Sequence, residues 1–271
     1  MGRIADRFAE LGAAGRKGLI TFITAGDPNV AATPALMHAL VRGGADVIEL
    51  GVPFSDPMAD GEVIQRASER ALAHGTSLDD VFAAVAEFRR EDARTPVVLM
   101  GYLNPVEHMG AARFAARAAE AGVDGTLIVD LPPEEAGEVT PALRAAGLDE
   151  IFLVAPNSPE GRIRKVCAAA SGFVYFVSVK GVTGTKSAVL EEIGARIEMT
   201  RRFAGMPVGI GFGIRTPDAA ADAASVADAV IVGSAIVEII ERGAAPDETA
   251  HAVESFVTSL RSAIDARARA A

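Results

Sequence analysis

Short apolar runs alternate with longer amphipathic runs along almost the whole chain, and this alternation constrains the fold more than any other feature of the sequence. The apolar runs are rich in Val, Ile and Phe and are nearly continuous, which is typical of strands buried on both faces. The pattern repeats roughly every thirty residues, the length of a strand–helix–strand unit. Eight strands are predicted, at 19–25, 46–52, 96–102, 125–131, 150–156, 172–178, 207–214 and 227–234.

The amphipathic runs predict helices between these strands and at both ends of the chain. An opening helix carries Ile4, Phe8 and Leu11 at helical spacing. Further helices are predicted at 31–42, 63–73, 78–89, 111–121, 133–146, 159–169, 189–203, 217–224, 235–242 and 246–268. Eight strand–helix units in 271 residues predict an α/β fold, a (β/α)8 TIM barrel with an extra N-terminal helix and a short extra helix before the last helix. No Pro/Ser-rich linker divides the chain, so we expect a single domain over residues 1–271.

A doubly wound open sheet would satisfy the same alternation of strands and helices. Such sheets usually carry a G-x-G-x-x-G loop directly after the first strand, where it binds a dinucleotide. Residues 23–28 of this chain read ITAGDP, which is not such a loop. The sequence therefore favours the closed barrel.

Composition excludes several classes of protein. A formal net charge of -10 argues against nucleic acid as a partner, because phosphate backbones are bound by clustered Lys and Arg. The four histidines are scattered and the only cysteine is Cys167, so neither a metal site nor an intramolecular disulfide is expected. No apolar run approaches the roughly 18 residues of a membrane span, and the N-terminus lacks the apolar core of a signal peptide. We expect a cytoplasmic protein.

Glu49 places a carboxylate inside the run VIELGV, which otherwise reads as a buried strand. Along a strand, Glu49 shares a face with Val47 and Gly51. Ile48 and Leu50 share the opposite face, which suits the covering helices, so Glu49 is predicted to point into the barrel. Burial near the strand end would raise the pKa of Glu49 toward neutrality and suit it to proton transfer. A structural ion pair is the alternative, although the predicted strands contain no Lys or Arg.

The loop that follows, at residues 53–61, is long and apolar for a simple strand–helix connection. Phe54 and Met58 would be exposed there unless they cover a ligand or meet a partner protein. Asp60 precedes Gly61, a residue that allows a sharp backbone reversal, so its carboxylate could reach over the barrel mouth. Asp before Gly is also a common turn former, and the spacing alone does not decide between the two roles.

Glycine-rich segments mark the exits of the last three predicted strands: 181–184 after the sixth, 211–213 in the seventh and 233–234 after the eighth. Glycine lets backbone N–H groups approach a phosphate closely, and a helix beginning near Ser234 would direct its positive end at the anion. An acidic protein can hold an anionic substrate in this way without a basic patch. Simple turn formation is the alternative to phosphate binding.

Seven segments are distinctive: GLITFITAGDP (18–28), ELGVPFSDPMADGEVIQ (49–65), VVLMGYLNP (97–105), DLPPEE (130–135), GVTGT (181–185), GFGI (211–214) and GSAIV (233–237). In this order, along essentially the whole chain, they resemble the tryptophan synthase α subunit family. The resemblance implies a lyase that cleaves indole-3-glycerol phosphate to indole and glyceraldehyde 3-phosphate. It further implies no cofactor in this chain and a partner, the pyridoxal-phosphate-dependent β subunit, in an α2β2 assembly for tryptophan biosynthesis.

The resemblance also implies roles for individual residues. Glu49 would deliver a proton to indole C3, and Asp60 would accept the indole N–H and stabilise positive charge on the ring. Tyr175 corresponds to a substrate-contacting tyrosine close to Glu49. The other implied substrate-binding residues are Phe22, Met100, Tyr102, Leu127, Val129, Thr183 and Phe212, and the implied phosphate-binding residues are Gly184, Gly213, Gly233 and Ser234.

Three positions depart from the family pattern: Glu62 and Thr21 stand where Pro is usual, and Lys180 stands where Arg is commoner. Glu62 adds charge and a freer backbone beside Asp60, which predicts a more mobile loop and weaker activity without the β subunit. A lyase that acts alone and releases free indole is an alternative with the same chemistry. A non-catalytic activator of the β subunit is another, but such a protein would not need a buried carboxylate.

Overall fold

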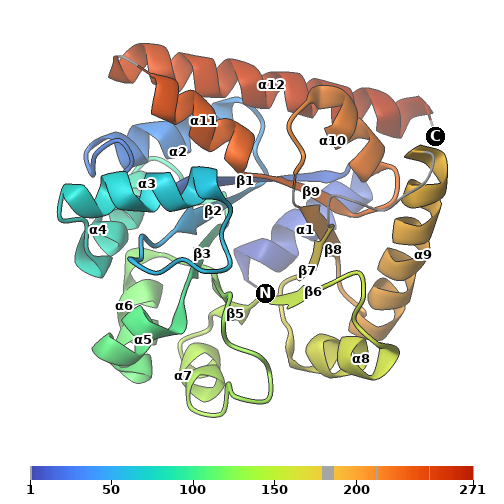
Figure 1. The fold of residues 1–271 in the computed structure, drawn as a ribbon, viewed down its shortest axis with the longest axis horizontal. Coiled ribbons are helices and arrows are strands. Elements are labelled where there is room, and N and C mark those ends of the chain that lie inside the picture. The colour runs from blue at the N-terminus through green and yellow to red at the C-terminus, as the bar shows by residue number, and fades with distance from the viewer. Residues whose placement is uncertain (1, 179–185, 212, 244, 271) are drawn as a thin grey trace.

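The computed structural model describes residues 2–178, 186–211, 213–243 and 245–270. Its strands form one parallel sheet, with the order β5-β4-β3-β2-β1-β9-β8-β7-β6. The strands at the two ends of this order are separated in sequence only by Ile151, so the sheet closes on itself as a barrel (Figure 1). They are β1 (Gly18–Thr24), β2 (Val47–Gly51), β3 (Val97–Gly101), β4 (Gly125–Ile128), β5 (Asp149–Glu150), β6 (Phe152–Val154), β7 (Val174–Val177), β8 (Val208–Gly211) and β9 (Ala229–Val232).

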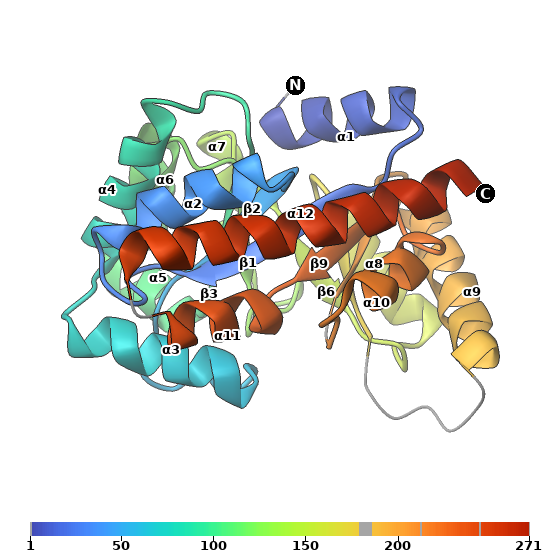
Figure 2. The ribbon, with the colours of Figure 1, turned by 90° about the horizontal axis from the view of Figure 1, so that it is seen from above.

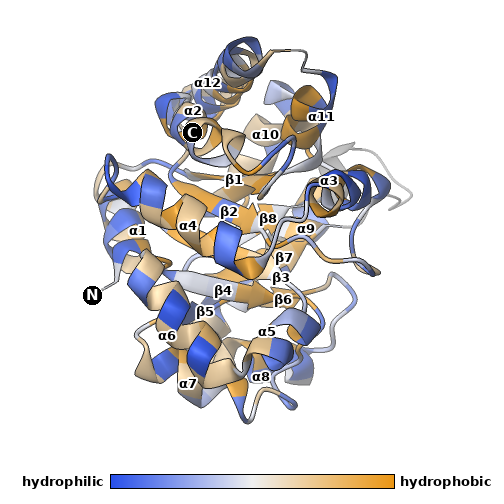
Figure 3. Cartoon of the chain, turned by 90° about the vertical axis from the view of Figure 1, so that its left-hand side faces the viewer, coloured by the Kyte–Doolittle hydropathy of each residue, from blue (hydrophilic) through white to orange (hydrophobic). Residues whose placement is uncertain are grey.

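Helices surround this sheet, and their hydrophilic faces point outward while the strands inside are mostly hydrophobic (Figure 3). The predicted (β/α)8 barrel is therefore confirmed, including the extra helix α1 and the short helix α11 that precedes the last helix. The helices are α1 (Arg3–Ala13), α2 (Ala32–Arg42), α3 (Glu62–Ala73), α4 (Leu78–Arg89), α5 (Leu103–Met109), α6 (Ala111–Ala121), α7 (Val139–Ala145), α8 (Glu160–Ala169), α9 (Lys186–Ala204), α10 (Pro217–Ala224), α11 (Ser234–Arg242) and α12 (Pro246–Ala270). Across the described segments, none of these helices is both long and apolar enough to span a membrane.

Some element boundaries differ from the sequence prediction. The strand predicted at 150–156 is divided into β5 and β6, although Ile151 between them still donates its N–H to the Thr126 carbonyl, at 2.8 Å. The helix predicted at 133–146 is shortened to α7, because residues 133–138 form turns that begin at the second residue of the Pro132–Pro133 pair. Helix α5 was not predicted, since it is a short helix without an amphipathic period.

The barrel interior follows the side-chain alternation predicted from the sequence. Val47 packs in the inner cluster of the barrel, whereas Ile48 and Leu50 pack outward against the helices. The register of the parallel strands sets Glu49 level with Phe22 of β1 and Val98 of β3.

Helix α1 closes one end of the barrel. Ile4 is fully buried in the inner cluster, and the ring of Phe8 lies against Phe173, with 5.9 Å between the ring centroids. Figure 2 shows α1 at one end of the molecule, and α3 and α11 toward the opposite end. That opposite end, where the parallel strands finish, is where a (β/α)8 barrel places its functional groups.

Candidate active site

A cavity of about 340 Å³ opens at the carboxyl ends of the strands. Nine of the residues predicted for the site line it, so the fold brings together groups from β1 to the start of α11. They are Phe22, Glu49, Asp60, Met100, Val129, Tyr175, Gly213, Gly233 and Ser234. Within the described parts of the chain, no group of three or more His, Cys, Asp or Glu side chains is placed to hold a metal ion.

Glu49 lies deep in this cavity and is only 1% exposed. Its Oε1 atom has no hydrogen-bond partner, and no ion pair to Glu49 is found within the described ranges. Burial raises the pKa of the Glu49 carboxyl to about 8. The alternative of a structural ion pair is therefore not supported, and the carboxyl group can hold or release a proton near neutral pH.

Asp60 is the second carboxyl group of the cavity, and side-chain hydrogen bonds from Tyr102 and Gln65 help to hold the loop around it. The Tyr102 hydroxyl donates to Asp60 Oδ2 at 3.1 Å and accepts the Ala59 N–H at 3.0 Å. The Gln65 side chain donates to the Asp60 carbonyl at 2.9 Å. Burial raises the pKa of Asp60 to about 6, although the hydrogen bond from Tyr102 acts in the opposite direction. Asp60 therefore ionises below neutral pH, while Glu49 still keeps its proton.

Tyr175 occupies the cavity wall beside a glycine that leaves it room. A Cβ atom at Gly211 would lie 2.3 Å from the Tyr175 hydroxyl oxygen, a distance that no side chain tolerates. Burial is the main cause that raises the pKa of Tyr175 well above its ordinary value, and the charges of Glu49 and Asp60 add to it. The hydroxyl group therefore stays protonated.

The ring of Phe22 is fitted between two glycines in the same manner. A Cβ atom at Gly51 would lie 2.6 Å from the Phe22 ring, and one at Gly233 would lie 3.2 Å from the Phe22 Cβ. The ring thus forms one wall of the cavity, and Met100 and Val129 add apolar surface. Such walls suit a flat aromatic ligand with few polar atoms.

Gly213, Gly233 and Ser234 also line the cavity, and Gly233 lies beside Phe22. Gly213 has a φ of 74°, a conformation that favours glycine, and Ser234 begins α11, a helix of nine residues. The backbone N–H groups of the first turn of α11 and the positive end of the helix dipole suit an anion bound at the start of this helix. Arg215 also lines the cavity here and is ion-paired with Glu238.

Several predicted residues do not line this cavity. Leu127 is fully buried in the inner cluster below it, packed with the other core side chains. Tyr102 contacts the site through Asp60 and lines a small adjoining space instead. The predictions for Thr183, Gly184 and Phe212 lie outside the described residues.

Other lining residues were not predicted. Leu153, Val177 and Ile231 point into the barrel by the same alternation that places Glu49, so strand periodicity could have identified them. Arg215 lies beyond a strand end, where no periodic pattern applies. The full set of unpredicted lining residues is Ala59, Gly61, Ile64, Leu153, Val177, Ile214, Arg215 and Ile231.

The closed parallel barrel and the two carboxyl groups in its apolar mouth define a (β/α)8-barrel enzyme of acid–base chemistry. The family model for the tryptophan synthase alpha chain matches residues 8–266. A tryptophan synthase alpha chain of Burkholderia pseudomallei (strain K96243) is 56% identical over 271 residues, which is the whole of both chains. The chain belongs to the tryptophan synthase alpha chain family.

Solved structures agree with this assignment. Tryptophan synthase subunit alpha from Legionella pneumophila str. Paris superposes with a TM-score of 0.90 at 45% identity, covering 98% of this chain and 99% of that one. A chain of tryptophan synthase from M. tuberculosis, in its aminoacrylate-bound form, superposes with a TM-score of 0.86 at 36% identity. The match covers 97% of this chain and 100% of that chain.

Proposed function

We propose that this chain is a carbon–carbon lyase that cleaves indole-3-glycerol phosphate to indole and glyceraldehyde 3-phosphate in tryptophan biosynthesis. The observation that carries the proposal is Glu49, a buried carboxyl group without an ion-pair partner among the described residues, in a cavity with apolar walls. Family membership supports the same reaction.

The first step is transfer of the Glu49 proton to C3 of the indole ring. Protonation at C3 leaves positive charge centred on the ring nitrogen. The Asp60 carboxylate stabilises this charge by accepting a hydrogen bond from the ring N–H. The two pKa values suit these roles, since near pH 7 Glu49 is protonated and Asp60 is ionised.

The second step breaks the bond between C3 and the glycerol carbon. The Glu49 carboxylate formed in the first step removes the proton from the hydroxyl group on that carbon, which becomes the aldehyde. The electron pair of the broken bond returns to the ring and restores indole. Glu49 thus regains the proton that it gave, and the cycle requires no cofactor in this chain.

Binding of the substrate follows from the apolar and the glycine-rich residues that line the cavity. The indole ring lies beside Phe22, Met100 and Val129, and Tyr175 packs next to it. The phosphate group is held at the start of α11 by Ser234, with Gly213 and Gly233 giving close backbone approach and Gly184 as a further proposed phosphate-binding residue. Thr183 and Phe212 complete the proposed binding set.

A tryptophan synthase β subunit is the proposed partner, as α2β2, and it would contain the pyridoxal phosphate. Support comes from the loop that carries Asp60, where Met58 is 86% exposed at the barrel mouth. Phe54 in the same loop stacks on Tyr102, with 5.2 Å between the ring centroids. A partner protein on this face would cover the exposed apolar group and act on the catalytic loop. Neither nucleic acid nor membrane is a proposed partner, and the cytoplasm is the proposed location.

An assay of indole release tests the proposal. The purified chain is given indole-3-glycerol phosphate, with and without a tryptophan synthase β subunit. Release of indole and glyceraldehyde 3-phosphate in equal amounts, faster with the β subunit, is the expected result. Release that the β subunit does not accelerate would favour a lyase that acts alone. Absence of release under both conditions would contradict the proposed lyase.

A further inference from the structure

Two helices begin at the rim of the cavity, and each contributes one lining residue, Ile64 from α3 and Ser234 from α11. Helix α3 follows directly after Asp60, and α11 begins at Ser234. Their inner faces share an apolar cluster that includes Ala67 and Val237. Apolar contacts are non-directional, so this packing alone does not fix how far one helix is shifted along the other.

A charged network fixes the relative position of the two helices. Arg70 of α3 binds Asp27 through two bonds, Nε to Oδ1 and Nη2 to Oδ2, each of 2.8 Å. Its remaining nitrogen, Nη1, donates to Glu241 of α11 at 2.8 Å. Arg66, one turn earlier on α3, binds the same Glu241 through two bonds of 2.7 and 2.9 Å.

Arg70 is the centre of this network because it contacts both carboxylates at once. Its partner Asp27 follows β1 and is 1% exposed, so the α3 helix is tied to the barrel itself as well as to α11. A guanidinium group bound at both ends of its planar fork imposes direction as well as attraction. The hydrogen bond from Arg66 is the main cause that lowers the pKa of Glu241 to about 2, so this carboxylate stays ionised at working pH.

We propose that Arg70 is a positioning residue, which sets the distance between the Asp60 wall and the Ser234 wall through its bonds to Asp27 and Glu241. The inference rests on the proposed function, in which one substrate places its ring at Asp60 and its phosphate at Ser234. A ligand that contacts both walls depends on their spacing. Two separate ligands, each bound at one wall, do not depend on that spacing.

The Arg70→Lys variant tests this inference. Lysine keeps the charge but lacks the planar fork, so it cannot hold both carboxylates in the same geometry. We expect kcat/KM for indole-3-glycerol phosphate to fall about tenfold or more, because small misplacements of reacting groups are costly. Binding of indole and of glycerol 3-phosphate, each measured alone, should stay within about threefold of the original chain. An unchanged kcat/KM would overturn the inference. Weaker binding of both indole and glycerol 3-phosphate, in parallel with the loss of kcat/KM, would also overturn it.

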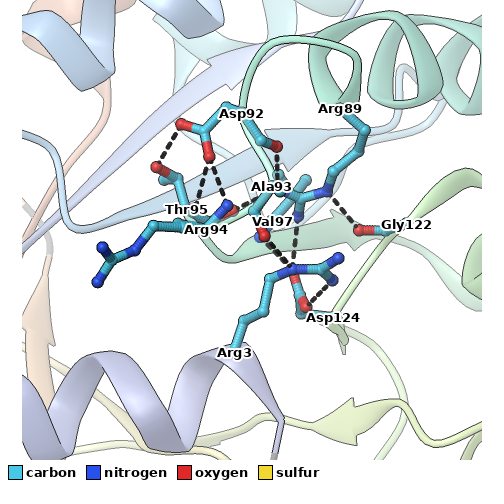
Figure 4. Close-up of polar contacts among 9 residues, drawn as sticks. All are labelled: Arg3, Arg89, Asp92, Ala93, Arg94, Thr95, Val97, Gly122 and Asp124. Carbon is cyan, nitrogen blue, oxygen red and sulfur yellow. Dashed lines mark hydrogen bonds and ion pairs between the residues drawn. The ribbon is translucent and has the colours of Figure 1, made fainter.

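Arg89 provides a matched control at another ion-pair network (Figure 4). Its Nη2 donates to Asp124 at 2.7 Å, its Nε to the Gly122 carbonyl at 2.9 Å and its Nη1 to the Thr95 carbonyl at 2.7 Å. None of these residues lines the catalytic cavity. The Arg89→Lys variant should lower the melting temperature while kcat/KM stays within about twofold of the original. An equal loss of kcat/KM in both lysine variants would contradict a special role for Arg70.

A second variant keeps the test decisive if Arg70→Lys does not fold. Glu241→Gln leaves the Arg70–Asp27 pair intact and weakens both links from α3 to α11, the one through Arg66 as well as the one through Arg70. It should show the same pattern, with weaker turnover of the whole substrate and near-normal binding of its two separate parts. Indole release by the original chain is measured first. Its absence contradicts the proposed lyase, whereas an active original chain with a fully active Glu241→Gln variant contradicts only the positioning role.

Discussion

At the residue scale, the site depends on two carboxyl groups, Glu49 and Asp60, whose different surroundings give them different pKa values. Glu49 has no hydrogen-bond donor on Oε1, and its pKa is raised to about 8. Asp60 has a donor in Tyr102, and its pKa is raised only to about 6. Between these values one group is a proton donor and the other an anion, which predicts a bell-shaped pH dependence of kcat/KM for the free chain.

Tyr102→Phe should move the acidic limb of that profile to higher pH. The hydrogen bond from Tyr102 stabilises the ionised form of Asp60, so its loss raises the pKa of Asp60 further. The measurement is kcat/KM from pH 5 to pH 9, with the alkaline limb, set by Glu49, as the internal control. An acidic limb that does not move would show that Asp60 is not the group that must ionise.

Arg215→Ala should weaken substrate binding more than turnover. Arg215 lines the cavity together with the proposed phosphate-binding residues, and its loss should raise KM several-fold, by about 1 kcal/mol of binding, while kcat changes little. Arg242→Ala is the control, since Arg242 also pairs with Glu238, at 3.6 Å, but does not line the cavity. Equal KM values for the two variants would contradict a phosphate contact by Arg215.

At the scale of elements, periodicity identified the eight strand positions of the barrel and most of its helices. It identified Glu49 as inward-facing because side chains alternate along a strand, whereas Phe22 was predicted from the family resemblance. Helix α5 was missed, since its seven residues are too few to show an amphipathic period. The hydrogen bond from Tyr102 to Asp60 joins residues 42 positions apart, and no local pattern in the sequence encodes such a contact.

Helix α1 should contribute to stability rather than to catalysis. Ile4→Ala would leave a cavity beneath the inner core and cost about 2 to 5 kcal/mol in the free energy of unfolding. Denaturant unfolding measures the loss, and kcat/KM of the folded variant should match the original chain. Leu72→Ala, at a leucine that is 36% exposed, is the control and should cost far less. A normal stability for Ile4→Ala would contradict the packing of α1 against the core.

At the scale of the whole molecule, barrel closure brings residues between positions 22 and 234 into one cavity. Strand alternation predicted Glu49, the segments after strand ends predicted Asp60 and Ser234, and the family resemblance supplied Tyr175. The spacing between the two helical walls could not be predicted, since it depends on side chains from three separate segments, Asp27, Arg70 and Glu241.

The single domain proposed for residues 1–271 can be tested by limited proteolysis, which should leave one resistant fragment spanning most of the chain.

The most direct test of the central claim is the fate of the C3 proton in Glu49→Gln. In D2O the original chain should release indole that carries deuterium at C3, because the Glu49 carboxyl exchanges its hydrogen with solvent. Glutamine keeps the shape but cannot donate this proton, so the rate should fall by at least about 10² while glycerol 3-phosphate still binds. Near-normal release of C3-deuterated indole by Glu49→Gln would contradict the account.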